Sequence, residues 1–99
     1  MTDYTTSDDL ALPGAPTSPS GTALTGGILA SWTAGTGSDI TAYEVVVYLT
    51  GTEVARVRSS AKPIAVTGLA TSAHTFKVRA YNATGWGPLS VASSNVTPT

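Results

Sequence analysis

The sequence predicts an all-β protein, a two-layer antiparallel sandwich of about seven short strands. Three observations support this fold class. Several segments alternate apolar and polar residues, which gives a strand one buried and one exposed face. Turn residues, mostly Gly, Ser and Thr, separate these segments at intervals of roughly 8–12 residues. No segment shows the period of roughly 3.6 residues that is typical of an amphipathic helix.

Residues 1–14 are predicted to form a flexible acidic arm, and residues 15–99 the folded domain. The arm carries three aspartates and neither Lys nor Arg, a side-chain charge of −3, and it has no hydrophobic period. Tyr4, Leu10 and Leu12 are its candidate anchors for docking on a partner surface. The alternative is that these residues are a frayed terminus or a remnant of cloning.

The first two strands are predicted at residues 15–24 and 28–33. Pro16 and Pro19 have no N–H group to donate to a sheet, so the first strand is expected at an edge and broken. The second strand is apolar at every second position and ends near Trp32. We expect Trp32, the largest of these side chains, to lie at the centre of the core.

Three further strands are predicted at residues 40–49, 53–58 and 63–67, and short Gly- and Ser-containing turns separate them. In the first of them, the side chains pointing to one face are Tyr43, Val45 and Val47, and those pointing to the other are Glu44, Val46 and Tyr48.

The clearest alternation of the chain lies at residues 74–82, which we expect to form the central strand. Phe76 and Val78 belong to its apolar face, whereas Lys77 and Arg79 belong to its polar face. A last strand is predicted at residues 89–96, where the pattern is weaker because Ser and Ala dominate.

Composition excludes several classes of protein. A chain of 99 residues is expected to form one domain, and the absence of cysteine excludes disulfides and thiolate metal sites. Charged residues make up 11% of the chain and the net charge is −1, which argues against a nucleic-acid partner. No apolar run approaches the roughly 20 residues that span a bilayer, and no secretory signal is expected at the start. We expect a monomer in isolation.

Five stretches of the chain together form a pattern that is specific for one fold: Pro16, Ala30-Ser31-Trp32, Ile40-Thr41-Ala42-Tyr43-Glu44-Val45, Val66-Thr67-Gly68-Leu69 and Phe76-x-Val78-x-Ala80-x-Asn82-x-x-Gly85-x-Gly87-x-x-Ser90. Over about residues 15–98, this pattern resembles the fibronectin type III family in its bacterial and bacteriophage form. The resemblance implies a seven-stranded, antiparallel immunoglobulin-like sandwich, a generic scaffold whose function is not fixed by the fold.

One position departs from the family pattern. Members usually have a tyrosine at the start of the sixth strand, which forms a hydrogen bond back to the preceding corner. Here the segment after Leu69 is one residue shorter and His74 stands in the tyrosine's place. An imidazole could donate to the same backbone carbonyl. The alternative is that this hydrogen bond is lost at some cost in stability.

No constellation of residues predicts catalysis. His74 is the one histidine, and no acid or nucleophile stands in a motif relation to it, so we interpret it as structural. Asp39, Glu44 and Glu53 are the acids outside the arm, and we expect ordinary solvated charges rather than a catalytic pair. We therefore expect no enzymatic activity, no metal site and no cofactor.

The best candidate binding surface is the exposed face shared by the strands at 40–49 and 74–82, which are neighbours in this fold. Tyrosine and arginine are enriched at binding hot spots, although β-propensity alone would also place such residues on a strand. The face comprises Glu44, Val46, Tyr48, Lys77, Arg79 and Tyr81, and we take Val46, Tyr48, Lys77, Arg79 and Tyr81 as its candidate binding residues.

Trp86, which lies between two glycines, is a second candidate. It could stack on a sugar ring or a partner protein, or fold back onto the sandwich.

These observations favour a non-catalytic structural or adhesion module. One hypothesis is a phage virion surface protein, a capsid decoration or tail component, whose arm docks on the particle while the sandwich meets the host surface or its glycans weakly. The alternative is a spacer module of a secreted bacterial polysaccharide-degrading enzyme, whose linkers are usually richer in Pro, Gly and Ser than residues 1–9. Both place the protein on a virion surface or outside the cell, with a protein partner, either the parent particle or neighbouring domains.

Overall fold

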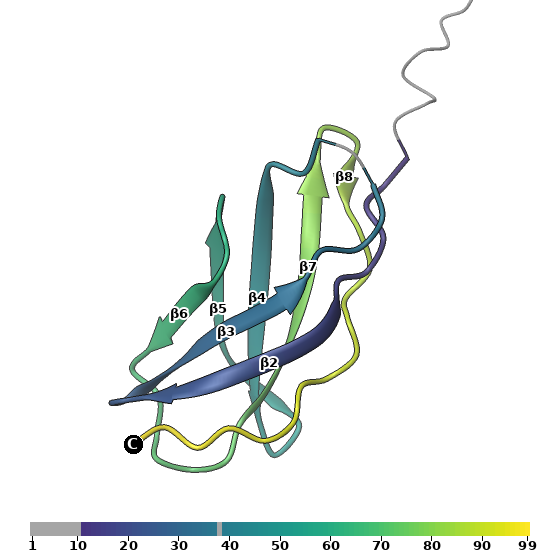
Figure 1. The fold of residues 1–99 in the computed structure, drawn as a ribbon. Helices are drawn as coiled ribbons and strands as arrows, with labels where there is room; N and C mark the ends of the chain where they lie inside the picture. The colour runs from purple at the N-terminus through teal and green to yellow at the C-terminus, as the bar shows by residue number, and fades with distance from the viewer. Residues whose placement is uncertain (1–10, 38) are drawn as a thin grey trace, which may run out of the picture.

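Two antiparallel sheets pack face to face in the computed structural model, which describes residues 11–37 and 39–99 (Figure 1). The predicted all-β sandwich is confirmed, and no helix occurs among these residues. The strands are β2 (Thr17–Leu24), β3 (Gly27–Thr33), β4 (Ala42–Leu49), β5 (Thr52–Ser59), β6 (Ile64–Thr67), β7 (Thr75–Asn82) and β8 (Gly85–Trp86).

The smaller sheet has the strand order β2-β3-β6 and the larger one the order β5-β4-β7-β8. Strand β4 therefore lies between β5 and β7, and Val45 is paired with Val57 on one side and Val78 on the other. At the outer edge of the smaller sheet, the register of β2 shifts between Thr17 and Ser20. This irregularity agrees with the broken edge strand that the prolines predict.

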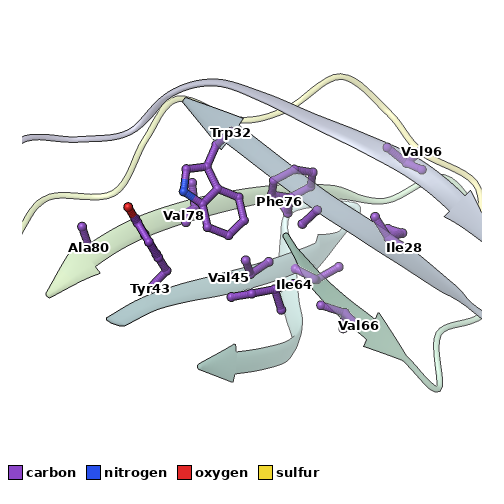
Figure 2. Close-up of a cluster of buried hydrophobic side chains, with 12 residues drawn as sticks. Ile28, Trp32, Tyr43, Val45, Ile64, Val66, Phe76, Val78, Ala80 and Val96 are labelled. Atoms are coloured by element: carbon purple, nitrogen blue, oxygen red, sulfur yellow. The ribbon is translucent and has the colours of Figure 1, made fainter. Parts of the chain in front are cut away.

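The core lies between the sheets, where alternate side chains of both sheets meet (Figure 2). Trp32 is 6% exposed, and its ring contacts the Tyr43 ring edge-on at a centroid distance of 5.1 Å. The prediction that Trp32 is a core residue is confirmed. Gly21 of β2 lies so close to Val96 that a Cβ atom there would collide with that side chain, and it would also crowd the ring of Phe76.

The predicted strand at 89–96 is wrong, since these residues form only one isolated bridge, between His74 and Val96. The tail nevertheless follows β7 through hydrogen bonds at every third tail residue: the N–H groups of Ser90 and Ser93 donate to the carbonyls of Val78 and Phe76. The two serine hydroxyls accept the N–H groups of the same two β7 residues, each at 3.0 Å. Hydroxyls therefore take the place of the carbonyls that a regular strand would supply.

His74 is buried at the start of β7, and its Nδ1 lies 2.6 Å from the carbonyl oxygen of Ser72. A carbonyl oxygen only accepts, so Nδ1 carries the proton and donates. The histidine thus forms a hydrogen bond to the backbone of the preceding corner, as expected if it substitutes for the family's tyrosine.

Residues 11–14, which the sequence places in the arm, lie against the sandwich. The Asn82 side chain donates to the Ala11 carbonyl, and the Gly14 N–H donates to Thr36. Pro13 is buried, and its carbonyl approaches Gly87 so closely that a Cβ atom there would collide with it. Leu12 remains 50% exposed, whereas the other candidate anchors, Tyr4 and Leu10, lie outside the described residues.

Candidate functional site

The strongest candidate surface is the side of the β5-β4-β7-β8 sheet that points away from the core, here called the outer face. Paired residues on neighbouring antiparallel strands share a face, so the register determines its composition. Glu44 is paired with Arg58 and Arg79, and Val46 with Arg56 and Lys77. The complete set of charged and aromatic side chains is Glu44, Tyr48, Glu53, Arg56, Arg58, Lys77, Arg79, Tyr81 and Trp86.

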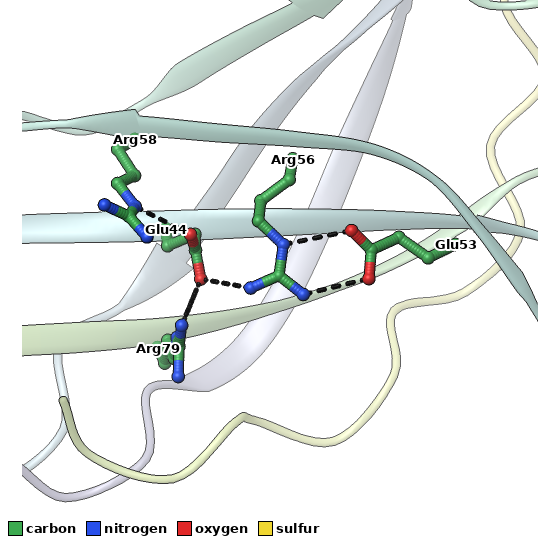
Figure 3. Close-up of polar contacts among 5 residues, drawn as sticks. All are labelled: Glu44, Glu53, Arg56, Arg58 and Arg79. Atoms are coloured by element: carbon green, nitrogen blue, oxygen red, sulfur yellow. Dashed lines mark hydrogen bonds and ion pairs between the residues drawn. The ribbon is translucent and has the colours of Figure 1, made fainter.

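Glu44 stands at the centre of this face and accepts hydrogen bonds from three arginines (Figure 3). Arg56 Nη1 lies 2.9 Å from Oε1, and Arg79 Nε lies 2.7 Å from the same oxygen. Arg58 Nε lies 2.8 Å from Oε2. The carboxylate has no exposed area because these side chains cover it, so the expectation of an ordinary solvated charge is wrong for Glu44.

The arginines also determine the charge of Glu44. Burial alone would raise the pKa of its carboxyl group. The hydrogen bonds from Arg58 and Arg79, together with the positive charges of Arg79 and Arg56, outweigh burial and hold this pKa below its ordinary value of 4.5. Glu44 is therefore a carboxylate at neutral pH and compensates part of the positive charge around it.

Arg56 also forms a two-point ion pair with Glu53 at the periphery of the outer face. Arg56 Nε lies 3.0 Å from Oε2, and Nη2 lies 2.9 Å from Oε1 (Figure 3). The pair lowers the pKa of Glu53 and raises that of Arg56. Both side chains are 42% exposed, so we expect this pair to orient Arg56 more than it stabilises the fold.

Aromatic rings pair with the basic groups of the outer face. The guanidinium carbons of Arg79 and Arg58 lie 4.6 Å and 5.3 Å from the ring centroid of Trp86. The Trp86 ring also meets that of Tyr81 at 4.9 Å, and Lys77 lies over the ring of Tyr48 at 5.6 Å. Such cation–π contacts restrict the positions of both partners. Trp86 is therefore folded back onto the sheet, the second of the two alternatives for this residue.

The structure brings the predicted outer-face residues together, but two of them, Glu44 and Val46, are buried. Tyr48, Lys77, Arg79 and Tyr81 are all partly exposed on this side of the sheet. Val46, in contrast, has no exposed area, so the expectation that it contributes surface is wrong. Long side chains flank Val46 on both neighbouring strands, and their aliphatic stems exclude water from it.

Arg56 and Arg58 are functional candidates that were not predicted from the sequence. A usable signal was present, because they alternate with Ala55 and Val57 on a strand that a short turn connects to β4. That alternation places both arginines on the side opposite to the core.

Other kinds of site are not found among the described residues. No group of three or more His, Cys, Asp or Glu residues there could hold a metal ion, and no pocket is present in that part of the chain. Within residues 11–37 and 39–99, no helix is long and apolar enough to cross a membrane.

Comparison with known proteins supports the fold at the level of a family. The model of the fibronectin type III domain family matches residues 14–96. No curated protein sequence matches the chain.

Several solved structures resemble the chain. Their sequence identities to it are low, so the likeness supports a shared fold and nothing further. A titin structure, "Titin kinase and its flanking domains", is 21% identical with a TM-score of 0.76, over 89% of this chain and 17% of that one. Domains d3–d4 of the rat CD45 extracellular region are 19% identical with a TM-score of 0.70, over 86% and 51%. The sixth fibronectin type III domain of human fibronectin type III domain containing protein 3 is 22% identical with a TM-score of 0.71, over 89% and 88%. The chain thus spans about a sixth of the first of these structures and half of the second.

Proposed function

Because the chain belongs to the fibronectin type III family, we propose that it is a non-catalytic structural and adhesion module whose outer face binds a protein partner. The observation that carries this proposal is the composition of the outer face. Arginine and aromatic side chains are concentrated there, and these residue types dominate binding hot spots. Their positions are restricted by Glu44 and by the ring contacts, so little side-chain entropy is lost on binding.

For the setting of this module, we propose the surface of a phage virion, with the acidic N-terminal residues docking on the particle. Support comes from the composition of residues 1–9, which include a single Ser and neither Pro nor Gly. Flexible interdomain linkers are usually rich in these residues.

The second setting is a spacer module of a secreted polysaccharide-degrading enzyme. One observation favours it: the chain enters the described fold at residue 11 near β8 and reaches Thr99 at the opposite end of the sandwich (Figure 1). Neighbouring domains joined at these two points would be held apart by the length of the strands. The intact mass of the native product distinguishes the settings, because a product of about 10 kDa fits the virion component and a much longer chain fits the spacer.

Site-specific photocrosslinking tests the binding role. The photoreactive residue p-benzoylphenylalanine replaces Tyr48 on the outer face in one variant and Ala65, an exposed residue of the smaller sheet, in the other. After irradiation in the native source, we expect a discrete adduct from the Tyr48 variant and none from the Ala65 variant. An adduct confined to the Ala65 variant, or none from the Tyr48 variant, would overturn the proposal.

A further inference from the structure

We propose that the outer face selects a partner segment rich in Asp and Glu, and that the Arg58 guanidinium binds a carboxylate of that segment. This inference rests on the proposed binding function and specifies the chemistry of the partner. The first reason for it is the distribution of charge along the chain.

The outer face is a basic surface on an acidic protein. It carries four of the five Lys and Arg residues of the chain, against two glutamates, a side-chain charge of +2. Lys62, Asp39 and the three N-terminal aspartates account for the remaining −3, which gives the net charge of −1. Electrostatic attraction accelerates the association of an acidic segment with this surface. Repulsion between like charges disfavours basic partners.

The buried carboxylate leaves the terminal groups of Arg58 unused. Glu44 accepts Arg56 and Arg79 at Oε1 and only the Nε of Arg58 at Oε2. Among residues 11–37 and 39–99, no acceptor engages the two terminal nitrogens of Arg58, whose side chain is 62% exposed. A guanidinium offers parallel N–H groups that match the two oxygens of a carboxylate.

Arg58 is also held in place before a partner arrives. Its Nε is fixed by Glu44, and its guanidinium carbon lies 5.3 Å from the centroid of the Trp86 ring. Two restraints on one long side chain reduce the conformational entropy that binding would cost. Glu44 is thus a positioning residue for Arg58, and it does not contact the partner itself.

A carboxylate on a protein fits this surface better than a sugar ring does. Sugar recognition uses open aromatic faces, whereas Arg79 and Arg58 lie over Trp86 and Lys77 lies over Tyr48. An acidic peptide needs only the exposed basic groups, and aromatic and arginine side chains around them are typical of protein interfaces.

NMR titration of the full ¹⁵N-labelled chain tests this inference. The probe is a synthetic peptide of about ten residues that alternates Glu and Gly, and the matched control peptide carries Gln in place of Glu. We expect the Arg58 Nε–H and Trp86 indole N–H signals to shift with the acidic peptide alone. We also expect binding to weaken as salt rises from about 50 to about 300 mM, because the attraction is between exposed charges.

Two charge-removing variants distinguish Arg58 from general electrostatics. Arg58→Gln is expected to weaken binding about tenfold, because water compensates part of the loss of a two-point contact at an exposed guanidinium. Lys62→Gln removes the same charge away from the outer face, where Lys62 contacts the Trp32 carbonyl, and should leave the affinity unchanged. Equal losses in the two variants would refute a specific role for Arg58.

Three other results would overturn the inference. A sulfated heparin fragment that binds where the peptide does not would assign the face to a polysaccharide. Peptide binding only after removal of residues 1–10 would show that the chain's own acidic residues occupy the face. No peptide binding, together with Tyr48-dependent photocrosslinking in the native source, would show that the partner is not acidic while the proposed binding function stands.

Discussion

Replacing Glu44 with glutamine is expected to destabilise the domain by about 2 kcal/mol. Glutamine keeps the shape but presents an amide NH₂ group where a guanidinium now donates, and it removes the negative charge from a site with no exposed area. Removing one partner of a fully buried pair costs about 3–5 kcal/mol when the other charge stays buried. Here the arginine side chains are 25–62% exposed and can turn toward water, so we take a lower value, comparable to a hydrogen bond with a charged group, about 1.5–3 kcal/mol.

Urea denaturation followed by tryptophan fluorescence measures this loss. At this chain length, about 2 kcal/mol corresponds to a decrease in Tm of roughly 8–16 °C. The slope of unfolding free energy against urea should not change, because the same surface is exposed on unfolding.

The dependence on pH provides a second measurement on the same pair of proteins. The folded pKa of Glu44 lies below its ordinary 4.5, so the stabilisation is complete above about pH 4.5 and is lost as pH falls through the folded pKa. Glu44→Gln should therefore lose less stability than the wild type when both are acidified below pH 4.5.

The matched control is Glu53→Gln, the same chemical change at an exposed carboxylate that pairs with Arg56. We expect its effect on stability to be much smaller, since exposed ion pairs contribute little. If the two variants lose equal stability at neutral pH, the three arginines around Glu44 do not stabilise the fold more than an exposed ion pair does.

Three further changes test other parts of the structure. Trp32→Ala should cost about 3–5 kcal/mol in urea denaturation because it leaves a cavity between the sheets, and a loss below about 1 kcal/mol would contradict its core position. Ser93→Ala should cost about 1–3 kcal/mol, since it leaves the buried N–H of Phe76 without its hydroxyl acceptor, whereas a cost equal to that of the exposed control Ser94→Ala would refute this role. Gly87→Ala should displace Pro13, which hydrogen exchange at the Gly14 amide would detect as faster exchange, and unchanged exchange would contradict the close contact.

Most strands could be predicted from the sequence because their information is local. A period of two suffices to place a segment such as 74–82 in a sheet and to orient its side chains. The tail after Gly87 could not be predicted in this way. Its contacts to β7 recur every third residue and use serine hydroxyls, so it shows no alternation that marks a strand.

Part of the candidate site follows from the same local rule, which places Tyr48, Lys77 and Arg79 on one side of the sheet. The burial of Glu44 on that side does not follow, because it depends on the register of three strands and on where long side chains from two of them end. The contact of residues 11–14 with the sandwich could not be predicted from the sequence either. It requires glycines elsewhere in the chain, and the local sequence around them does not indicate which segment will pack against them.

The tail after Gly87, in which Ser90 and Ser93 form hydrogen bonds to β7, affects the tendency to aggregate when many copies are crowded together. A regular outermost strand would present a continuous row of N–H and C=O groups, and another chain could add to it as a template for aggregation. A tail that contacts β7 at every third residue offers no such ladder. Other features hinder pairing at the remaining edge strands: β2 has a register shift, β6 is only four residues long, and β5 carries the charged side chains of Glu53, Arg56 and Arg58. We therefore expect copies held at high local density to remain separate, because their edge strands do not pair with one another.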